Sequence, residues 1–99
     1  MKFDWDDKKA KSNEKKHYVS FEEATIAFQD EFAVEIYDAN HSSVSEKRFI
    51  LIGEANERIL FIVYTVSDEN TTNEIYRLIS AREAETWEVK EYEQERFKE

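Results

Sequence analysis

The feature that most constrains the fold is an unbroken apolar run from Ile59 to Tyr64, inside the segment 58–66. A continuous run of β-branched and aromatic residues with polar residues on both sides is typical of a strand that is buried on both faces. We therefore expect segment 58–66 to be the central strand of a sheet. Shorter patterns of the same kind predict further strands over residues 32–37, 48–52 and 74–82.

The edges of this sheet are less strongly patterned. Alternation along 32–37 predicts a half-exposed strand with Val34 and Ile36 pointing inward. Phe3 and Trp5 alternate with charged residues, which favours a short strand at the start of the chain. The polar stretch 53–57 predicts the turn between the two central strands.

Helices are expected on both sides of the strand-forming region. Ser20 and Glu23 have the spacing of a capping box, in which Ser20 caps a helix and Glu23 returns the hydrogen bond. This helix should end near residues 29–30. A polar, lysine-rich helix is expected over 7–16, and a glutamate-rich helix from Glu83 to about Phe97. The order predicts a single α+β domain over 1–99, with N-terminal helices, an antiparallel sheet of about four strands and a C-terminal helix.

The composition excludes several classes of function. With one glycine, no proline and no cysteine, the chain cannot build a glycine-rich phosphate loop, a disulfide or a thiolate metal site. The two histidines, His17 and His41, lack metal-ligand spacing, so we expect no metal and no cofactor. No apolar run approaches the roughly 20 residues of a membrane span, and the N-terminus lacks the apolar run of a signal peptide. We therefore expect a cytoplasmic protein without membrane contact.

The charge is unevenly distributed. The formal net charge is −9, which argues against indiscriminate coating of nucleic acid. Residues 1–19 nevertheless carry six lysines against four acidic residues, and four arginines fall within 48–82. Such a distribution allows a local basic cleft on an acidic body.

Arg77 and Arg82 stand in the otherwise apolar segment 75–82. Strict alternation places them on opposite faces of the last strand. A buried arginine keeps its charge, so it needs a carboxylate partner or a bound anion. A structural salt bridge and a phosphate-facing site both satisfy that requirement, and the local sequence leaves both open.

Several motifs follow one another in order through nearly the whole chain. They are Trp5-Asp6, Asn13-Glu14-Lys15-Lys16-His17-Tyr18-Val19-Ser20-Phe21-Glu22-Glu23-Ala24, Phe28-Gln29-Asp30, Glu46-Lys47-Arg48, Ile52-Gly53, Tyr64-Thr65, Arg77-Leu78-Ile79-Ser80-Ala81-Arg82-Glu83-Ala84, Glu88 and Tyr92. In these motifs the chain resembles the BrnT family of bacterial toxins. One departure is Tyr18, where the family usually has glycine, and it concerns the backbone turn after His17.

The resemblance implies a type II toxin with a RelE-like ribonuclease fold. Such a toxin cleaves RNA, arrests translation and is neutralised by a BrnA-type antitoxin encoded beside it. The antitoxin supplies the DNA-binding part, so the toxin would reach operator DNA only through this partner. The acidic charge of the chain is consistent with DNA binding by the antitoxin, and it is less consistent with strong affinity of the toxin for RNA.

Metal-free RNA cleavage needs a base for the 2′-hydroxyl, cations for the phosphorane and an acid for the leaving oxygen. Arginine suits the cationic role because its fork matches phosphate oxygens. The expected cations are Arg77, Arg82 and Arg48, and the acid/base candidates are His17, Glu46 and Glu88. A histidine side chain ordinarily titrates near pH 6.5, close to working pH.

Each acid/base candidate also has a structural interpretation. His17 lies beside a helix start and could serve only to cap or pack. Glu88 could neutralise Arg82 or Arg77, and Glu46 could pair with Arg48 two positions away.

Three functions therefore remain open: a metal-independent ribonuclease toxin, an antitoxin-binding module with little or no catalysis that regulates its operon, and a metal-dependent nuclease using the many carboxylates.

Overall fold

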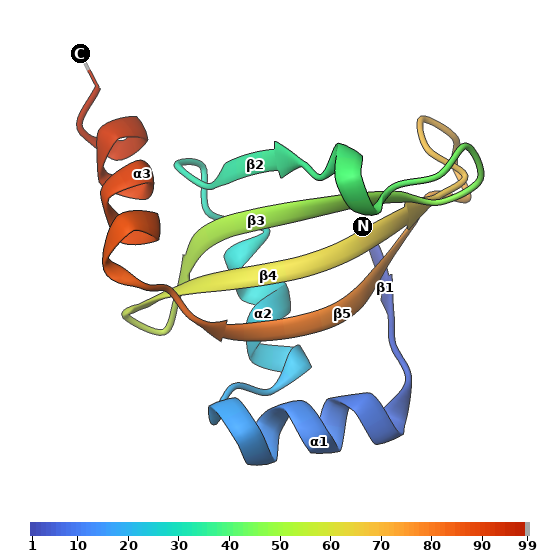
Figure 1. Cartoon of the computed structure of the whole chain (residues 1–99), viewed down its shortest axis with the longest axis horizontal. Helices are drawn as coiled ribbons and strands as arrows, with labels where there is room; N and C mark the ends of the chain where they lie inside the picture. The colour runs from blue at the N-terminus through green and yellow to red at the C-terminus, as the bar shows by residue number, and fades with distance from the viewer. Residues whose placement is uncertain (99) are drawn as a thin grey trace.

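The computed structural model describes residues 1–98 and has a mixed α+β fold (Figure 1). Its elements are β1 (Lys2–Asp4), α1 (Asp7–His17), α2 (Phe21–Ala27), β2 (Val34–Tyr37), the 3-10 turn η1 (Ala39–His41), β3 (Lys47–Ala55), β4 (Arg58–Ser67), β5 (Ile75–Glu83) and α3 (Thr86–Arg96). The predicted fold class is confirmed.

One sheet of five strands runs through the described residues, in the order β1-β5-β4-β3-β2. β4 is at its centre, as its apolar run predicts. β2, β3, β4 and β5 pair antiparallel, and β1 adds a parallel pairing to β5. The sheet has one strand more than the predicted four because the short β1 joins its edge.

The two strands of the central hairpin are longer than predicted. β3 continues through Gly53 to Ala55, and the turn consists of Asn56 and Glu57 alone, with φ of 50° and 69°. Positive φ at both positions belongs to a type I′ turn, whose twist matches the flanking strands. Gly53 lies inside the strand, where α2 packs closely against it. Glycine is required at this position because a Cβ would lie 2.9 Å from the Ala27 carbonyl oxygen.

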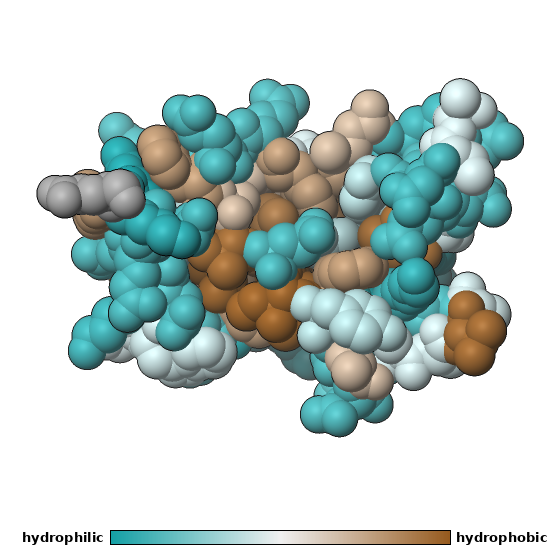
Figure 2. All heavy atoms as spheres, turned by 90° about the horizontal axis from the view of Figure 1, so that it is seen from above, coloured by the Kyte–Doolittle hydropathy of each residue, from teal (hydrophilic) through white to brown (hydrophobic). Residues whose placement is uncertain are grey.

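The sheet has a helix face and an open face. The helix face carries the core, including the fully buried Leu60, Ile62 and Tyr64, and is packed by α1 and α2. The open face carries Val34 and Ile36, which pair with Ile52 and Ile50. The prediction that Val34 and Ile36 point inward is therefore corrected, since both are half-buried on the side away from the core. Hydrophobic side chains also gather on the surface seen in Figure 2.

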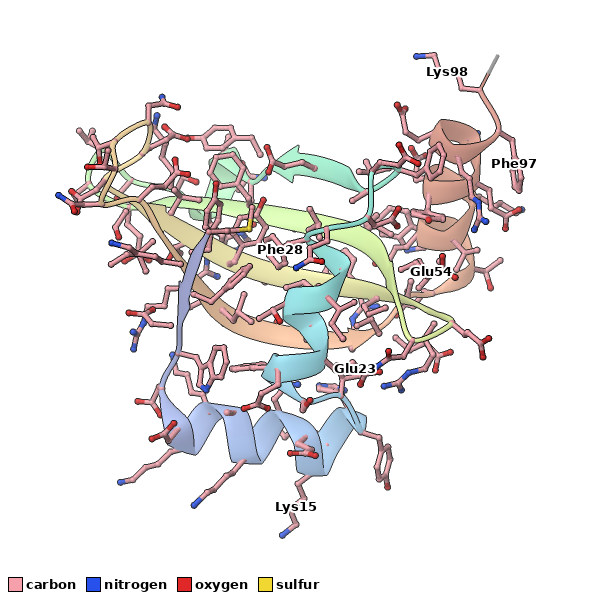
Figure 3. All side chains as sticks on the ribbon, turned by 180° about the vertical axis from the view of Figure 1, so that it is seen from behind. Lys15, Glu23, Phe28, Glu54, Phe97 and Lys98 are labelled. Atoms are coloured by element: carbon pink, nitrogen blue, oxygen red, sulfur yellow. The ribbon has the colours of Figure 1, made fainter. Side chains whose placement is uncertain are left out.

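α2 begins as predicted and ends earlier. The Ser20 side chain accepts a hydrogen bond from the Glu23 backbone (3.0 Å). The Glu23 side chain, however, lies against Arg58 and Asn56 of the hairpin rather than closing a capping box. The helix ends at Ala27, and Phe28 then packs edge-on against Phe3 and Tyr64 (Figure 3).

α3 starts later than predicted because β5 extends to Glu83, which pairs with Leu60. A capping box between Glu85 and Glu88 then starts α3 at Thr86. The helix stands at one end of the sheet (Figure 1), where the Tyr92 hydroxyl donates a hydrogen bond to Asp30 (2.7 Å).

Candidate functional site

A register shift in β5 brings the two predicted arginines to the same face. Val63 pairs with Ser80 and Tyr64 pairs with Leu78, so β5 carries one extra residue at this point. Such a bulge reverses the alternation beyond it. Arg77 and Arg82 therefore pair with Thr65 and Phe61, both on the open face, and the expectation of opposite faces is wrong.

Arg48 and Arg77 flank Thr65 in one row across the open face. Arg48 pairs with Thr65 in β3–β4, and Thr65 pairs with Arg77 in β4–β5. Two strand spacings put their Cα atoms about 10 Å apart. Arg77 forms an ion pair of 3.1 Å with Asp4, and both side chains are about half exposed. An exposed pair of this kind is weak, so Arg77 remains available to an anion.

Arg48 has an unsatisfied nitrogen. Its Nε is buried and has no hydrogen-bond partner among the described residues. A buried N–H of a charged group is costly when unpaired. The row thus offers two cations, Arg48 and Arg77. Of these, Arg48 has a buried N–H donor without a partner among the described residues.

Arg82 and Glu88 form a close ion pair. The guanidinium donates to both Glu88 carboxylate oxygens (2.7 and 2.8 Å) and lies 4.1 Å from the centre of the Phe61 ring. Glu88 is fully buried and also accepts from the Glu85 backbone (2.7 Å). Burial alone would raise the pKa of Glu88, but the hydrogen bonds from Arg82 and Glu85 and the Arg82 charge outweigh it and lower that pKa. The pair ties α3 to β5, which favours the structural interpretation of Glu88.

His17 lies at a hollow between α1 and β5. The hollow has a volume of about 210 Å³ and is lined by Lys9, Ser12, Asn13, Lys16, His17, Ile79 and Ser80. Lys9 and Lys16 fall on one helix face with Ser12 and Asn13, because these positions follow the helical repeat. A histidine, two lysines and two serines are thus among the residues that line a space open to solvent. Ser80 also belongs to the open face, so the hollow and the arginine row share β5.

The turn after His17 keeps the expected form without glycine. Tyr18 caps α1 in the left-handed conformation (φ 58°, ψ 32°), and its N–H bonds to the Glu14 carbonyl. Glycine adopts this conformation without strain. The departure at Tyr18 therefore leaves the backbone path intact.

Asn13 holds α1 against the edge of β5. Its amide donates to the carbonyls of Val19 (3.0 Å) and Ala81 (2.8 Å), and accepts from the Ala81 N–H (3.0 Å). The side chain is 93% buried, since its relative exposure is 7%. It extends the hydrogen bonding of β5 where β1 has ended. No role for Asn13 was predicted from the sequence. It stands three positions after Ala10, on a helix in which almost no other side chain points toward the sheet.

Glu46 is exposed, stands two positions before Arg48 and bonds through its backbone to Ser43. It therefore lies at the end of the sheet that carries the Arg48–Arg77 row, and it does not line the hollow. Arg82 lies further along β5, where it pairs with Glu88 of α3, and His17 lies at the hollow.

Two further features bear on function. Within residues 1–98, no three His, Cys, Asp or Glu side chains are placed to hold a metal ion. Across the same residues, no helix has the length and apolarity to cross a membrane.

The described residues thus form a small α+β domain with Arg48 and Arg77 in one row on the open face, and with lysines and a histidine at the hollow next to β5. Comparison with protein families gives a match over residues 5–88 to the family described as "Ribonuclease toxin, BrnT, of type II toxin-antitoxin system". The chain belongs to this family, whose membership implies an antitoxin protein as partner. Comparison with curated proteins gave no match. The matched segment contains every candidate residue and Asn13.

Proposed function

We propose that this protein is an endoribonuclease toxin that cleaves RNA without a metal ion, using the α1–β5 hollow and the neighbouring arginine row. The observation that carries the proposal is the placement of His17, Lys16 and Ser80 around one hollow next to β5, the strand that also carries Arg77. Family membership supports the ribonuclease class.

The proposed reaction is attack of the 2′-oxygen on the adjacent phosphorus. A base takes the proton of the 2′-hydroxyl, the new O–P bond forms, and the bond to the 5′-oxygen breaks as that oxygen receives a proton. His17 is suited to one of the two proton transfers. Arg77, Arg48 and the hollow's lysines would stabilise the negative charge that develops on the phosphate oxygens.

The contacts of Glu88 and the position of Glu46 argue against a role in proton transfer for either carboxylate. Both Glu88 oxygens are occupied by Arg82 and the Glu85 backbone, so Glu88 and Arg82 position α3 instead of exchanging protons. Glu46 is too far along the sheet to share a phosphate with the hollow.

The proposed biological role follows from the family. The toxin acts in the cytoplasm, arrests translation by cutting RNA, and is held inactive by a BrnA-type antitoxin that carries operator binding. The net charge of −9 supports this division, because such a chain has little affinity of its own for DNA.

A second candidate function is an antitoxin-binding module without catalysis. It is favoured by one observation: each β5 arginine already has a carboxylate partner, Asp4 for Arg77 and Glu88 for Arg82. In that case the hollow would be a surface feature only.

The test compares the two histidines. His17→Ala and the control His41→Ala are assayed with the wild type for cleavage of purified RNA and ribosome-bound RNA in the presence of a chelator. His41 is exposed and paired with Asp38 in η1, so its loss leaves the hollow unchanged. We expect His17→Ala to lower the rate by about a hundredfold and His41→Ala to change it little. Wild type that cuts neither RNA would refute the enzyme and leave the binding module.

A further inference from the structure

An apolar surface lies on the open face beside the arginine row. Four aliphatic residues form it, and we call them the aliphatic patch: Val34, Ile36, Ile50 and Val63. Ile36, Ile50 and Val63 stand side by side on three adjacent strands. All four are partly buried and keep some contact with solvent, and they lie outside the cluster that α1 and α2 cover. Figure 2 shows hydrophobic side chains gathered beside α3 on this side of the molecule.

The patch is bordered by unbalanced positive charge. Arg48 precedes Ile50 by two positions on β3 and therefore points to the same face. Its buried Nε has no partner within residues 1–98, and Arg77 beyond Thr65 is held only by an exposed ion pair. An occupant with a carboxylate at this border would pair with the charge of the Arg48 guanidinium.

The chemistry of the patch selects among occupants. RNA would need aromatic faces for stacking, whereas the patch is aliphatic, and the nearby Phe61 ring is covered by Arg82. A second copy would bring together two chains of net charge −9. A protein segment with aliphatic side chains and a carboxylate matches both the patch and its border.

We propose that the aliphatic patch is the docking site of the antitoxin, which lays an amphipathic segment across β2, β3 and β4 and pairs one of its carboxylates with Arg48. The inference rests on the proposed function, because it takes the partner to be the antitoxin of that system. The bound segment covers Arg48, one of the cations that the reaction needs, so it hinders RNA binding at the arginine row.

The test uses two neighbouring residues of β2 that face opposite sides. Ile36→Lys puts a charge into the patch, whereas Tyr37→Lys changes an exposed side chain on the helix face. Each variant is purified, checked for native melting and circular dichroism, and titrated calorimetrically with the antitoxin encoded beside the toxin gene. We expect Ile36→Lys to weaken binding at least about a hundredfold and Tyr37→Lys less than about fivefold.

A second variant guards against misfolding of the first. Arg48→Gln keeps a polar side chain, shorter than arginine, and removes the charge, and we expect it to weaken antitoxin binding at least tenfold. Unchanged affinity in both Ile36→Lys and Arg48→Gln would overturn the inference. It would also be overturned if the wild type formed a homodimer that Ile36→Lys dissociates, or if the antitoxin did not bind the wild type. RNA cleavage by the free toxin is scored separately, so failure of the ribonuclease assignment is distinguishable from failure of this docking site.

Discussion

Replacing Asn13 by alanine removes the side chain that joins α1 to the edge of β5. Three backbone groups lose their partner at once: the carbonyls of Val19 and Ala81, and the Ala81 N–H. Because β1 pairs only with residues 75–77, no strand replaces Asn13 beside Ala81. The change therefore tests how firmly one wall of the hollow is held.

The expected loss can be worked out from these contacts. A buried polar group left unpaired costs about 1–3 kcal/mol. The hollow beside Asn13 lets water reach the vacated groups, so we use about 1 kcal/mol for each of the three, giving about 3 kcal/mol in all. For a domain of this size, such a loss lowers the melting temperature by roughly 15 °C.

Urea unfolding followed by circular dichroism measures this loss. The control is Ser12→Ala, which changes the preceding, exposed residue and should alter stability by less than about 0.5 kcal/mol. Hydrogen exchange provides a local readout, because the Ala81 amide should lose protection in Asn13→Ala. A loss below about 0.5 kcal/mol, with Ala81 still protected, would show that Asn13 does not hold α1 in place.

Three further predictions concern stability. The pKa of Glu88 is below its ordinary 4.5, so its ion pair stabilises the fold fully above that value and is lost as the pH falls through the lowered folded value. Glu88→Gln should cost about 2 kcal/mol at neutral pH and flatten the acid limb of the stability curve; an unchanged limb would contradict this. Gly53→Ala should cost about 2 kcal/mol in a melt, since its Cβ meets the Ala27 carbonyl at 2.9 Å. Tyr18→Gly should gain about 1 kcal/mol by relieving the left-handed cap, and a loss would argue against strain there.

The parts of the fold that could be predicted depend on local chemistry. The apolar run 59–64 predicted the central strand, and β4 is the central strand, with Leu60, Ile62 and Tyr64 buried on its helix face. Ser20 marked the start of α2 because a cap side chain bonds to the third residue after it. Gly53 was misinterpreted as a turn because its role, close approach of α2, comes from a tertiary contact that the local pattern does not contain.

The site was harder to predict because it depends on one extra residue in β5. The bulge opposite Val63 and Tyr64 leaves no mark in the sequence, yet it moves Arg82 to the face of Arg77. Asn13 was missed because a polar residue on a lysine-rich helix resembles a solvated one. Its partner Ala81 is 68 positions away, and only the fold brings the two together.

The central claim is that RNA is cut at the β5 edge by cations of this chain. The most direct measurement is RNA cleavage, with chelator present, by the wild type, Arg77→Ala and Arg96→Ala. The two arginines are similarly exposed, at 47% and 42% of their side chains, but Arg96 lies on α3. We expect Arg77→Ala, shown to be folded, to lose at least about a hundredfold in rate, while Arg96→Ala stays near wild type. Equal cleavage by all three proteins would contradict the proposed site.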